Sequence, residues 1–511
     1  MGLVLGIDLG TTNSAMAVYN IESGEDAQIV KNIEGEDTTP SVVLFQSVDG
    51  KDEPLVGSLA KRQAVAFPED TVQYVKRYMG DPNWRFDSSS GNTYKSEEVS
   101  AIILKKLKSD AENVLGEEVS GVVITVPAYF DDARRVATRQ AGEIAGFNVL
   151  RVLNEPTAAA LSFGMDTMKT GNVLVYDLGG GTFDVTILKV DGYNFKVLAT
   201  DGDRNLGGFD IDNAIMKYVM DNVDGTVMQD SESLASLREK CEFAKIALSN
   251  VVNTSIHVNT DSGMKKVQLS REKLVDLSSV IFSRTRDITE DTLEESELSW
   301  SDIDHVLLVG GSTKMPAIKD MVEKMSGKKA SINVNPDLSV AKGAAIQALI
   351  EIANNGYDDG STSNNKNNLP DINIQDVTSQ SLGVLVIDTY SGKKINQIVI
   401  PHNSEIPNRF EADLCTVADN QTAINVEVTQ GDDPDPDYVT IIGSSTLEIP
   451  AYPKGAPIRI IYHYDIDQTV QVEVVDLTAK KMLGTFEIDR IANLNINEVM
   501  LAKAKLDSLN F

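Results

Sequence analysis

Two stretches of the chain place an aspartate, glycine and threonine in the same order after an apolar strand. The first reads Gly6-Ile7-Asp8-Leu9-Gly10-Thr11-Thr12-Asn13-Ser14, and the second runs from Asp177 through Gly179-Gly180-Gly181-Thr182 to Asp184. Glycine lets the backbone turn tightly and bring N–H groups close to a phosphate, and threonine adds a hydroxyl donor. An aspartate at the strand end can hold a hydrated divalent cation beside the phosphates. This chemistry suits a nucleotide.

The repetition matters, because a single loop of this kind is equally compatible with a tight β-hairpin that binds nothing. Each copy is followed by another apolar strand, at Ala15 to Val18 and at Val185 to Leu188. The repeat predicts two similar half-domains that close on one nucleotide.

The elements that position these loops follow an α/β pattern. From Met1 to about Ile352, strands alternate with helices, which predicts an α/β fold. Helical periodicity is present from Glu97 to Leu115, from Asp131 to Ala145 and from Ser231 to Leu248.

The character of the chain changes after this region. Residues 353–370 are rich in asparagine, aspartate, glycine and serine, and they predict a flexible linker. Short alternating strands separated by turn residues then occupy Leu382 to Ile488, which predicts an antiparallel β-sandwich. A short amphipathic helix is expected from Asn497 to Leu509, with apolar positions at Val499, Leu501, Leu506 and Leu509.

Composition excludes several classes of function. The net charge is −30, so the surface repels nucleic acid and anionic membranes, and neither is expected as a partner. Two cysteines cannot build a disulfide framework, and the four histidines lack metal-ligand spacing. No apolar run approaches the length of a membrane span, and the start of the chain lacks signal-peptide features. The chain is therefore expected to be cytoplasmic and, from its charge, monomeric.

Six motifs in a fixed order resemble the seventy-kilodalton heat-shock chaperone family, and the resemblance covers nearly the whole chain. Besides the two glycine loops, these motifs are Val126-Pro127-Ala128-Tyr129-Phe130, Asn154-Glu155-Pro156-Thr157, Val309-Gly310-Gly311-Ser312-Thr313, and Asn335-Pro336-Asp337 leading to Ala341-Lys342-Gly343. The resemblance implies an actin-like ATPase domain at residues 1–353 and a linker at 354–380. It implies a β-sandwich peptide-binding domain at 381–490 and a short C-terminal helix at 491–511.

The resemblance assigns roles around a bound ATP and Mg²⁺. Phosphate contacts are expected from Gly10, Thr11, Thr12, Asn13, Gly179, Gly180, Gly181, Thr182 and Gly208. Asp8 and Asp177 would hold Mg²⁺ through water, and Glu155 and Asp184 would complete an acidic ring. Asp184 is alternatively a turn residue that accepts backbone N–H bonds.

Lys76 matches the catalytic lysine of the family, which orients water at the γ-phosphate; the catalytic set is then Lys76, Glu155, Asp177 and Thr182. A lysine in this sequence context is otherwise an ordinary solvated surface charge.

The nucleoside is expected on the far side of the phosphates. Glu242, Lys245 and Ser249 share one face of a predicted helix and match ribose and adenine contacts in the family; the alternative is a surface Glu–Lys pair. Gly310, Gly311, Ser312, Lys314 and Asp337 are expected on the other side of the base. The family usually has arginine at the position of Lys314, and glutamate at that of Phe209.

Coupling between the domains is implied for Pro127, Arg135 and Glu155, although Arg135 is equally consistent with a first-turn salt bridge. The linker reads Asp371-Ile372-Asn373-Ile374-Gln375-Asp376, where Asn373 and Gln375 replace apolar family residues. We expect less apolar area to dock on the ATPase domain, and hence weak coupling.

The β-domain resembles the family's peptide-binding sandwich, which captures an extended segment through main-chain hydrogen bonds and an apolar pocket. The pocket residues implied are Leu414, Val417, Ile424 and Val426, which would otherwise be ordinary sandwich core. The loop from Thr389 to Lys394 is longer than in the family, and the helical lid that usually follows the sandwich is reduced to the final short helix.

The expected function is that of an ATP-dependent chaperone that binds exposed apolar segments of unfolded proteins. A J-domain co-chaperone and a nucleotide exchange factor are implied by the resemblance. Two alternatives remain at this point: a co-chaperone-like relative that scarcely turns nucleotide over, and a kinase that shares the duplicated loop.

Overall fold

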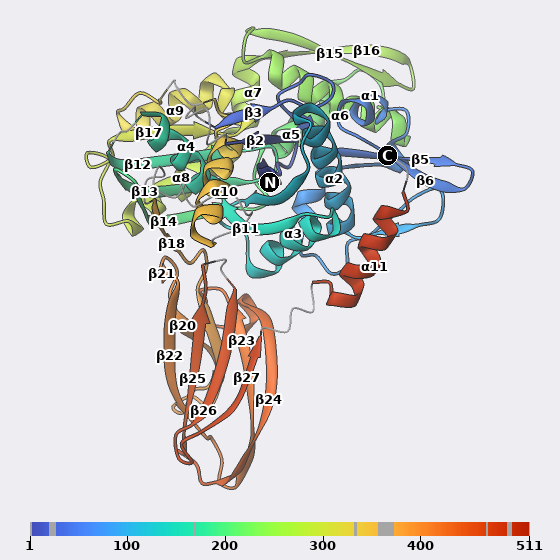
Figure 1. Cartoon of the computed structure of the whole chain (residues 1–511). Coiled ribbons are helices and arrows are strands. Elements are labelled where there is room, and N and C mark those ends of the chain that lie inside the picture. Colours follow the sequence, from blue (N-terminus) through green and yellow to red (C-terminus); the bar gives the residue numbers. More distant parts are fainter. Residues whose placement is uncertain are drawn as a thin grey trace.

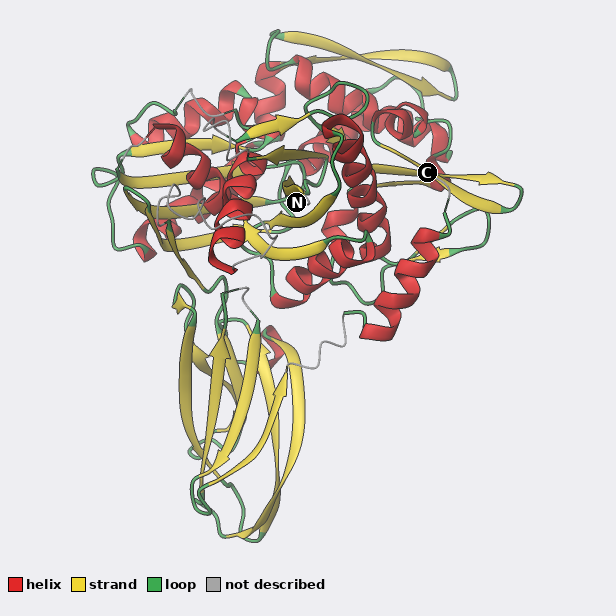
Figure 2. Ribbon diagram, in the orientation of Figure 1, coloured by secondary structure: helices red, strands yellow, loops and turns green. Residues whose placement is uncertain are grey.

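The computed structural model describes residues 3–19, 27–167, 170–331, 335–355, 372–466, 469–487 and 493–509. An upper body of sheets and helices carries both glycine loops, and an elongated β-sandwich extends below it (Figure 1). Helices surround the sheets of the upper body, whereas the lower part consists almost entirely of strands (Figure 2). None of the helices in the described ranges combines the length and apolar character that a membrane span requires.

The first lobe, as we call the part built on the N-terminal sheet, has the strand order β11-β10-β1-β2-β3, with β4 paired to β2. These strands are β1 (Leu3–Asp8), β2 (Asn13–Val18), β3 (Gln28–Val30), β4 (Thr39–Pro40), β10 (Val119–Val126) and β11 (Asn148–Asn154). Helices α2 (Ser96–Leu115) and α3 (Asp132–Ile144) pack on this sheet and share its buried core. A side sheet contains β5 (Val42–Val48), β6 (Lys51–Val56) and β7 (Thr71–Gln73), beside α1 (Ser58–Gln63) and the hairpin β8 (Phe86–Asp87) and β9 (Thr93–Tyr94).

The second lobe has the strand order β17-β12-β13-β14-β18-β21. Its strands are β12 (Gly171–Leu178), β13 (Phe183–Asp191), β14 (Asn194–Asp203) and β17 (His305–Val309), extended by β18 (Asn373–Val377) and β21 (Glu405–Ile406). Its other elements are α5 (Gly208–Asn222), α6 (Ser231–Ala247), the hairpin β15 (Asn253–Thr260) and β16 (Gly263–Ser270), α7 (Arg271–Leu277), α8 (Ser279–Glu295) and α9 (Pro316–Ser326). A separate apolar core fills this lobe.

Helices α4 (Glu155–Thr167) and α10 (Ser339–Asn355) lie where the two lobes join, and a third apolar core contains residues of both helices and both sheets. Their contact is made by backbone: a Cβ at Gly343 would lie 1.7 Å from the carbonyl oxygen of Ala158. A Cβ at Gly6 of β1 would likewise lie 2.0 Å from the backbone nitrogen of Ala345. Only glycine fits at these two positions.

The β-sandwich contains two four-stranded antiparallel sheets around an apolar core. One sheet contains β19 (Leu382–Ile387), β20 (Lys394–Ile400), β23 (Gln421–Gln430) and β24 (Thr440–Tyr452). The other contains β22 (Asn408–Cys415), β25 (Pro457–Tyr464), β26 (Val470–Asp476) and β27 (Lys481–Glu487). Strand β18 pairs in parallel with β14 and antiparallel with β21, so one sheet runs from the second lobe into the sandwich.

The C-terminal helix α11 (Ile496–Asp507) lies on the first lobe, against α2 and α3 (Figure 1). Leu506 and Ala502 are buried in the first-lobe core, and Val499 and Leu509 pack against it. Three ion pairs flank this contact, joining Lys505 to Glu98 (2.8 Å), Lys105 to Asp507 (2.9 Å) and Lys95 to Glu498 (3.2 Å). Leu501, expected on the apolar face, is 70% exposed instead.

The helices predicted for the first 250 residues are confirmed within one residue at each end, and antiparallel strands occupy the region predicted as a sandwich. The two ends of the segment that was predicted as a linker form regular secondary structure. Helix α10 continues to Asn355, and the linker residues from Asn373 form a paired strand. Residues 356–371, which carry most of the predicted flexible linker, lie outside the described residues.

Candidate functional site

A cavity of about 440 Å³ lies between the two lobes, and both glycine loops line it. This volume is within the range of small-molecule sites. Most residues expected at a nucleotide site contribute to its wall: Asp8, Gly10, Thr11, Thr12, Asn13, Lys76, Glu155, Asp177, Gly179, Gly180, Thr182, Glu242, Lys245, Ser249, Gly310, Gly311, Ser312, Lys314 and Asp337. Gly181 and Gly208 lie beside this wall rather than on it.

The two glycine loops face each other directly. A Cβ at Gly180 would lie 1.9 Å from Thr12 Oγ1, and one at Gly181 would lie 2.6 Å from Thr11 Cγ2. The glycines therefore allow the loops of the two lobes to approach each other, and their N–H groups are available to one ligand between them.

The first residues of α5 pack on the second glycine loop, together with Ser312 of the turn after β17. Gly208 N donates to Gly179 O (3.0 Å), Phe209 N donates to Gly180 O (2.7 Å), and Ser312 Oγ donates to Gly179 O (2.8 Å). A Cβ at Gly207 would lie 2.6 Å from Gly181 N, so this position requires glycine. Gly208 thus supports the second glycine loop through a backbone hydrogen bond.

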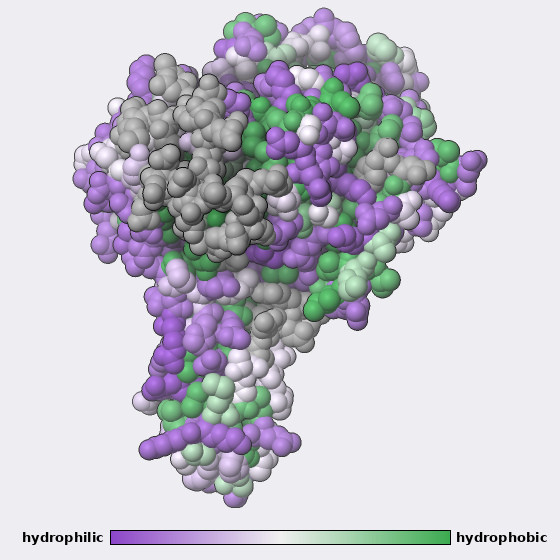
Figure 3. Space-filling model, in the orientation of Figure 1, coloured by the Kyte–Doolittle hydropathy of each residue, from purple (hydrophilic) through white to green (hydrophobic). Residues whose placement is uncertain are grey.

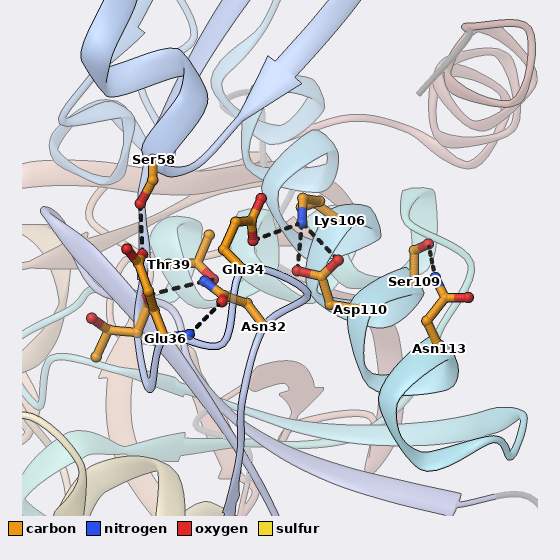
Figure 4. A network of polar contacts seen from close by, with 10 residues as sticks. Asn32, Glu34, Glu36, Thr39, Ser58, Lys106, Ser109, Asp110 and Asn113 are labelled. Atoms are coloured by element: carbon orange, nitrogen blue, oxygen red, sulfur yellow. Dashed lines mark hydrogen bonds and ion pairs between the residues drawn. The ribbon is translucent and has the colours of Figure 1, made fainter.

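A network of polar side chains connects residues of the segment from Asn32 to Thr39 with one another and with helix α2 (Figure 4). This segment leads to Ser41, which contacts the first glycine loop. Asn32 accepts from Glu36 N (2.8 Å) and donates to Thr39 Oγ1 (3.2 Å), and Lys106 of α2 bonds Asp110 (2.6 Å) and reaches Glu34 (3.5 Å). Thr39 belongs to β4, which pairs with Ser14 of β2.

Ser41, just after β4, completes the support of the first loop. Its N–H donates to Thr12 O (2.9 Å) and its Oγ donates to Gly10 O (2.7 Å). These two bonds fix the backbone of the first loop at Gly10 and Thr12.

Four carboxylate groups interact electrostatically in the cleft between the lobes, those of Asp8, Glu155, Asp177 and Asp184. Burial, followed by repulsion from Glu155, raises the pKa of Asp8 to about 7 and that of Asp184 to about 7. Burial and the same neighbour also raise the pKa of Asp177 well above its ordinary value. Asp184 lies in β13 and accepts from Tyr129 N of the first lobe (2.9 Å), so this bond joins the two lobes and does not cap a local turn.

This carboxylate set fits a hydrated divalent cation. The cluster concentrates negative charge that only one lysine offsets, so a cation lowers its energy. No group of three or more metal-binding side chains in the described residues is arranged for direct coordination. Mg²⁺ commonly retains several water ligands, so attachment through water by Asp8 and Asp177 suits this geometry.

Lys76 is not a surface lysine. It is 4% exposed, lies in the short helix η2 (Val75–Tyr78) and forms an ion pair with Glu155. The surface-charge alternative for Lys76 is therefore wrong. A buried ammonium beside the glycine loops can stabilise negative charge that develops on a phosphate.

The nucleoside side of the cleft is occupied by paired charges. Glu242 pairs with Lys61 of the first lobe (3.0 Å), and Lys245 donates to Asp212 (2.8 Å) and Gly208 O (2.9 Å). Glu242 and Lys245 thus bond other residues rather than each other, which excludes the simple surface pair. Ser249 lines the cavity but lies beyond the end of α6, not on the helix as predicted.

At another part of the cavity wall, Lys314 of η3 (Gly311–Lys314) forms an ion pair with Asp337. Gly310 adopts a φ of 82°, and a Cβ there would lie 2.5 Å from Leu178 O. The tight turn from β17 into η3 therefore depends on this glycine.

Sequence reasoning did not assign a role to several residues of the cavity wall, among them Tyr74 and Asp212. Burial raises the pKa of Asp212 to about 6, and its Oδ1 has no hydrogen-bond partner. Asp212 follows the Gly207-to-Asp210 motif by two residues, and this motif was the sequence signal that could have identified Asp212 as a cavity residue. Nothing in the local sequence identifies Tyr74, because its place depends on the folding of the side sheet.

Arg135 connects the first lobe to the linker strand. Its guanidinium is buried and donates to Ala128 O (3.1 Å), Phe130 O (3.0 Å) and Asn154 Oδ1 (2.6 Å). Asn154 in turn donates to Asp376 Oδ2 (2.8 Å) on β18. The first-turn salt bridge belongs to Arg134 and Asp131 instead. The carbonyl oxygen of Pro127 accepts from Phe130 N (3.1 Å), in the turn that contains Ala128 and Phe130.

We expected Asn373 to reduce the apolar area that the linker buries on the ATPase domain, but its side chain does not face that domain's core. Ile372 and Ile374 pack against the core between the lobes, whereas Asn373 is exposed. Successive residues of a strand point to opposite faces, so Asn373 and Gln375 share the face that turns away from this core.

The residues expected in the peptide pocket do not share one environment. Val426 is buried in the sandwich core, Leu414 and Ile424 pack against that core, and Val417 is 41% exposed. Leu414, Ile424 and Val426 therefore act as sandwich core in this structure.

The sequence matches a known protein family and known members of it. The protein-family model described as Hsp70 protein matches residues 4–90 and 83–503. The chaperone protein DnaK of Mycoplasmopsis synoviae (strain 53) is 41% identical over 509 residues, which cover 97% of this chain and 80% of that protein. The matched ranges include both glycine loops, the linker strand and the sandwich.

Proposed function

Because this chain belongs to the Hsp70 family of chaperones, we propose that it binds ATP between its two lobes, in an actin-like arrangement, hydrolyses it slowly, and thereby regulates its affinity for peptides. The observation that carries this proposal is the direct approach of the two glycine loops over buried carboxylates and Lys76. Such a cleft provides phosphate donors, a cation site and a buried positive charge, which phosphoryl transfer requires.

The phosphates of ATP would bind between the loops. Gly10, Gly180, Thr11, Thr12 and Thr182 line this space and would supply backbone N–H and hydroxyl donors. Asp8 and Asp177 would hold Mg²⁺ through water, and the ion would supply neutralisation of the phosphate charge. Lys76 holds a water for attack on the γ-phosphate, and Glu155 fixes the Lys76 ammonium by their ion pair.

The adenosine would lie between α6 and η3. Opening of the ion pairs of Lys245 and Lys314 frees these lysines for the ribose and the base. Lysine stacks less well on a purine than arginine does, so we expect modest adenine affinity.

The nucleotide state reaches the sandwich through the hydrogen bonds of Arg135, Asn154 and Asp376. Glu155 follows Asn154 directly, so a change at the γ-phosphate and a change at the linker strand occur on adjacent residues. We infer that the sandwich captures exposed apolar segments of unfolded proteins, with a J-domain protein and an exchange factor as partners and the cytoplasm as location.

The first experiment is fluorescence anisotropy of a labelled, leucine-rich extended peptide, in ADP and then in ATP. Binding in ADP that weakens in ATP supports a coupled chaperone. Binding that ignores the nucleotide indicates an uncoupled peptide binder, and absence of binding in both states contradicts the peptide function. The family match over the sandwich argues against the kinase alternative, which has no use for that domain.

A further inference from the structure

One aromatic contact joins the two lobes at the wall of the nucleotide cleft. Tyr74 belongs to the first lobe, between the core residues Val72 and Val75, and Phe209 belongs to the second lobe, between Leu206 and Ile211. Their ring centroids are 4.7 Å apart with an interplanar angle of 61°. This edge-to-face geometry is favourable for aromatic pairs. Both rings line the cavity.

Two guanidinium groups complete the contact. Arg77 of the first lobe lies 4.8 Å from the centroid of the Phe209 ring, and Arg238 of α6 lies 4.7 Å from it. Arg77 also contacts Asp210 (3.3 Å). Cations at these distances are attracted to an aromatic ring. We call Tyr74, Arg77, Phe209 and Arg238 the aromatic clasp.

Phe209 is fixed to the second glycine loop, so the clasp and the phosphate site move together. The Phe209 N–H donates to Gly180 O (2.7 Å), and the preceding Gly208 N–H donates to Gly179 O (3.0 Å). Separation of the lobes would therefore pull the Phe209 ring away from Tyr74 and Arg77, and would carry the glycine loop with it.

The backbone of Tyr74 supports a specific role. Its φ is 59°, in the left-handed region that a tyrosine rarely adopts. Such a conformation persists only where the surroundings hold it, and it places the ring against the opposite lobe.

Other described contacts across the cleft near the clasp are polar. They include Lys61 with Glu242 (3.0 Å), Arg77 with Asp210 and Ser231 with Glu69 (3.0 Å). Partly exposed ion pairs contribute little and weaken as salt increases. The ring contact does not share this dependence, so it can keep the lobes together at physiological ionic strength.

We propose that Tyr74 and Phe209 are positioning residues that hold the two lobes closed over a bound adenine nucleotide and slow its release. This inference rests on the proposed function, because it requires the nucleotide to occupy this cleft. The clasp must open before ADP leaves, so its strength sets the dissociation rate.

The test is the dissociation of radiolabelled ADP during a chase with unlabelled ADP, which avoids a fluorescent group on the ribose near Tyr74. We expect Phe209→Ala, which removes the aromatic pair and the cation–π contact with Arg77 of the other lobe, to accelerate release by about tenfold. Tyr74→Ala removes the aromatic pair alone and should accelerate release by about fivefold. Tyr74→Phe keeps the ring and should release ADP at the wild-type rate. The double alanine variant should be little faster than Phe209→Ala, since the ring pair is already lost in that variant.

Tyr78→Ala is the matched control. Tyr78 stacks on Trp84 (5.3 Å, 18°) within the first lobe, so this variant removes a tyrosine ring contact that does not cross the cleft. Its release rate should equal that of the wild type. Release rates of Phe209→Ala and Tyr74→Ala within twofold of wild type would overturn the proposal.

Phe209→Glu separates the clasp from a purely structural effect. A glutamate between Arg77 and Arg238 would replace ring contacts by ion pairs, so ADP release should depend more strongly on ionic strength than in the wild type. If Phe209→Ala fails to fold, Tyr74→Ala tests the same contact from the other lobe. Failure of the wild type to retain ADP would contradict the proposed function, whereas retention that these variants do not change would contradict the clasp alone.

Discussion

At the scale of single residues, the buried ion pair of Lys76 and Glu155 gives the sharpest expectation for hydrolysis. Lys76→Ala removes the positive charge nearest the phosphate site and leaves the glycine loops in place. We expect ATP binding within a few-fold of wild type and turnover lower by about 10²–10³ fold, the usual effect of losing a charge-stabilising group. Calorimetry and single-turnover hydrolysis would measure the two quantities; unchanged turnover would remove Lys76 from the catalytic residues.

The carboxylate cluster predicts a strict need for divalent cations. EDTA should reduce nucleotide affinity by at least about tenfold, because Asp8, Asp177 and Asp184 then repel the triphosphate without a neutralising ion. Titration of ATP with and without Mg²⁺, at matched ionic strength, measures this change. Equal affinity in both conditions would contradict the assignment of the cluster to a cation.

The residues recovered from sequence are those whose type is fixed by local backbone chemistry. Gly180 and Gly310 are glycine because the backbone there admits no Cβ, and such positions stand out in a sequence. Tyr74 and Asp212 were not recovered, because only the packed lobes bring them to the cleft. The same limit applies to Asn373, whose residue type suggested lost docking area although its side chain faces away from the core.

At the scale of elements, strand β18 connects the second lobe to the sandwich, because it pairs with β14 and with β21. Asn154→Ala would remove the bonds to Arg135 and to the buried Asp376 carboxylate. Hydrogen bonds to charged groups contribute about 1.5–3 kcal/mol, so docking of the strand should weaken at least tenfold. We expect the difference between peptide dissociation rates in ATP and ADP to collapse toward unity.

Asn373→Ala is the control for this prediction, because Asn373 is exposed on the same strand. It should keep the wild-type response to ATP. A normal ATP response in Asn154→Ala would show that the signal takes another route.

Helix α11 was predicted as an amphipathic helix, but the surface that receives it could not be predicted. Its partners on α2, Glu98 and Lys105, are about 400 residues away along the chain, at 407 and 402 positions from Lys505 and Asp507. Leu506→Ala should destabilise the docked helix by about 2 kcal/mol, as expected for a buried leucine. Hydrogen exchange of the α11 amides measures this change.

Leu501→Ala, at a position that is 70% exposed, should leave exchange of the α11 amides unaltered. The outer face of this helix carries further apolar side chains, Ile496 and Met500, and Figure 3 shows a hydrophobic area over the helix. Equal exchange in the Leu506 and Leu501 variants would mean that α11 does not rest on the first lobe in solution.

At the scale of the whole molecule, both ends of the sandwich sequence are attached to the ATPase lobes, through β18 at the second lobe and α11 at the first. The fold class could be predicted from alternating strands and helices followed by short strands alone. The relative placement of the domains could not, because it depends on contacts such as Asn403 with Glu295 (2.8 Å) that no local pattern encodes.

The backbone contact of α4 with α10 bears on how the lobes move. At Gly343 the backbones of the two helices meet directly, because a Cβ there would lie 1.7 Å from Ala158 O, so a rotation of the lobes would have its axis near this contact. Displacement in such a rotation grows with distance from the axis. Val340, on α10 beside this contact, would then move least among the cavity residues, and those at the far wall would travel furthest.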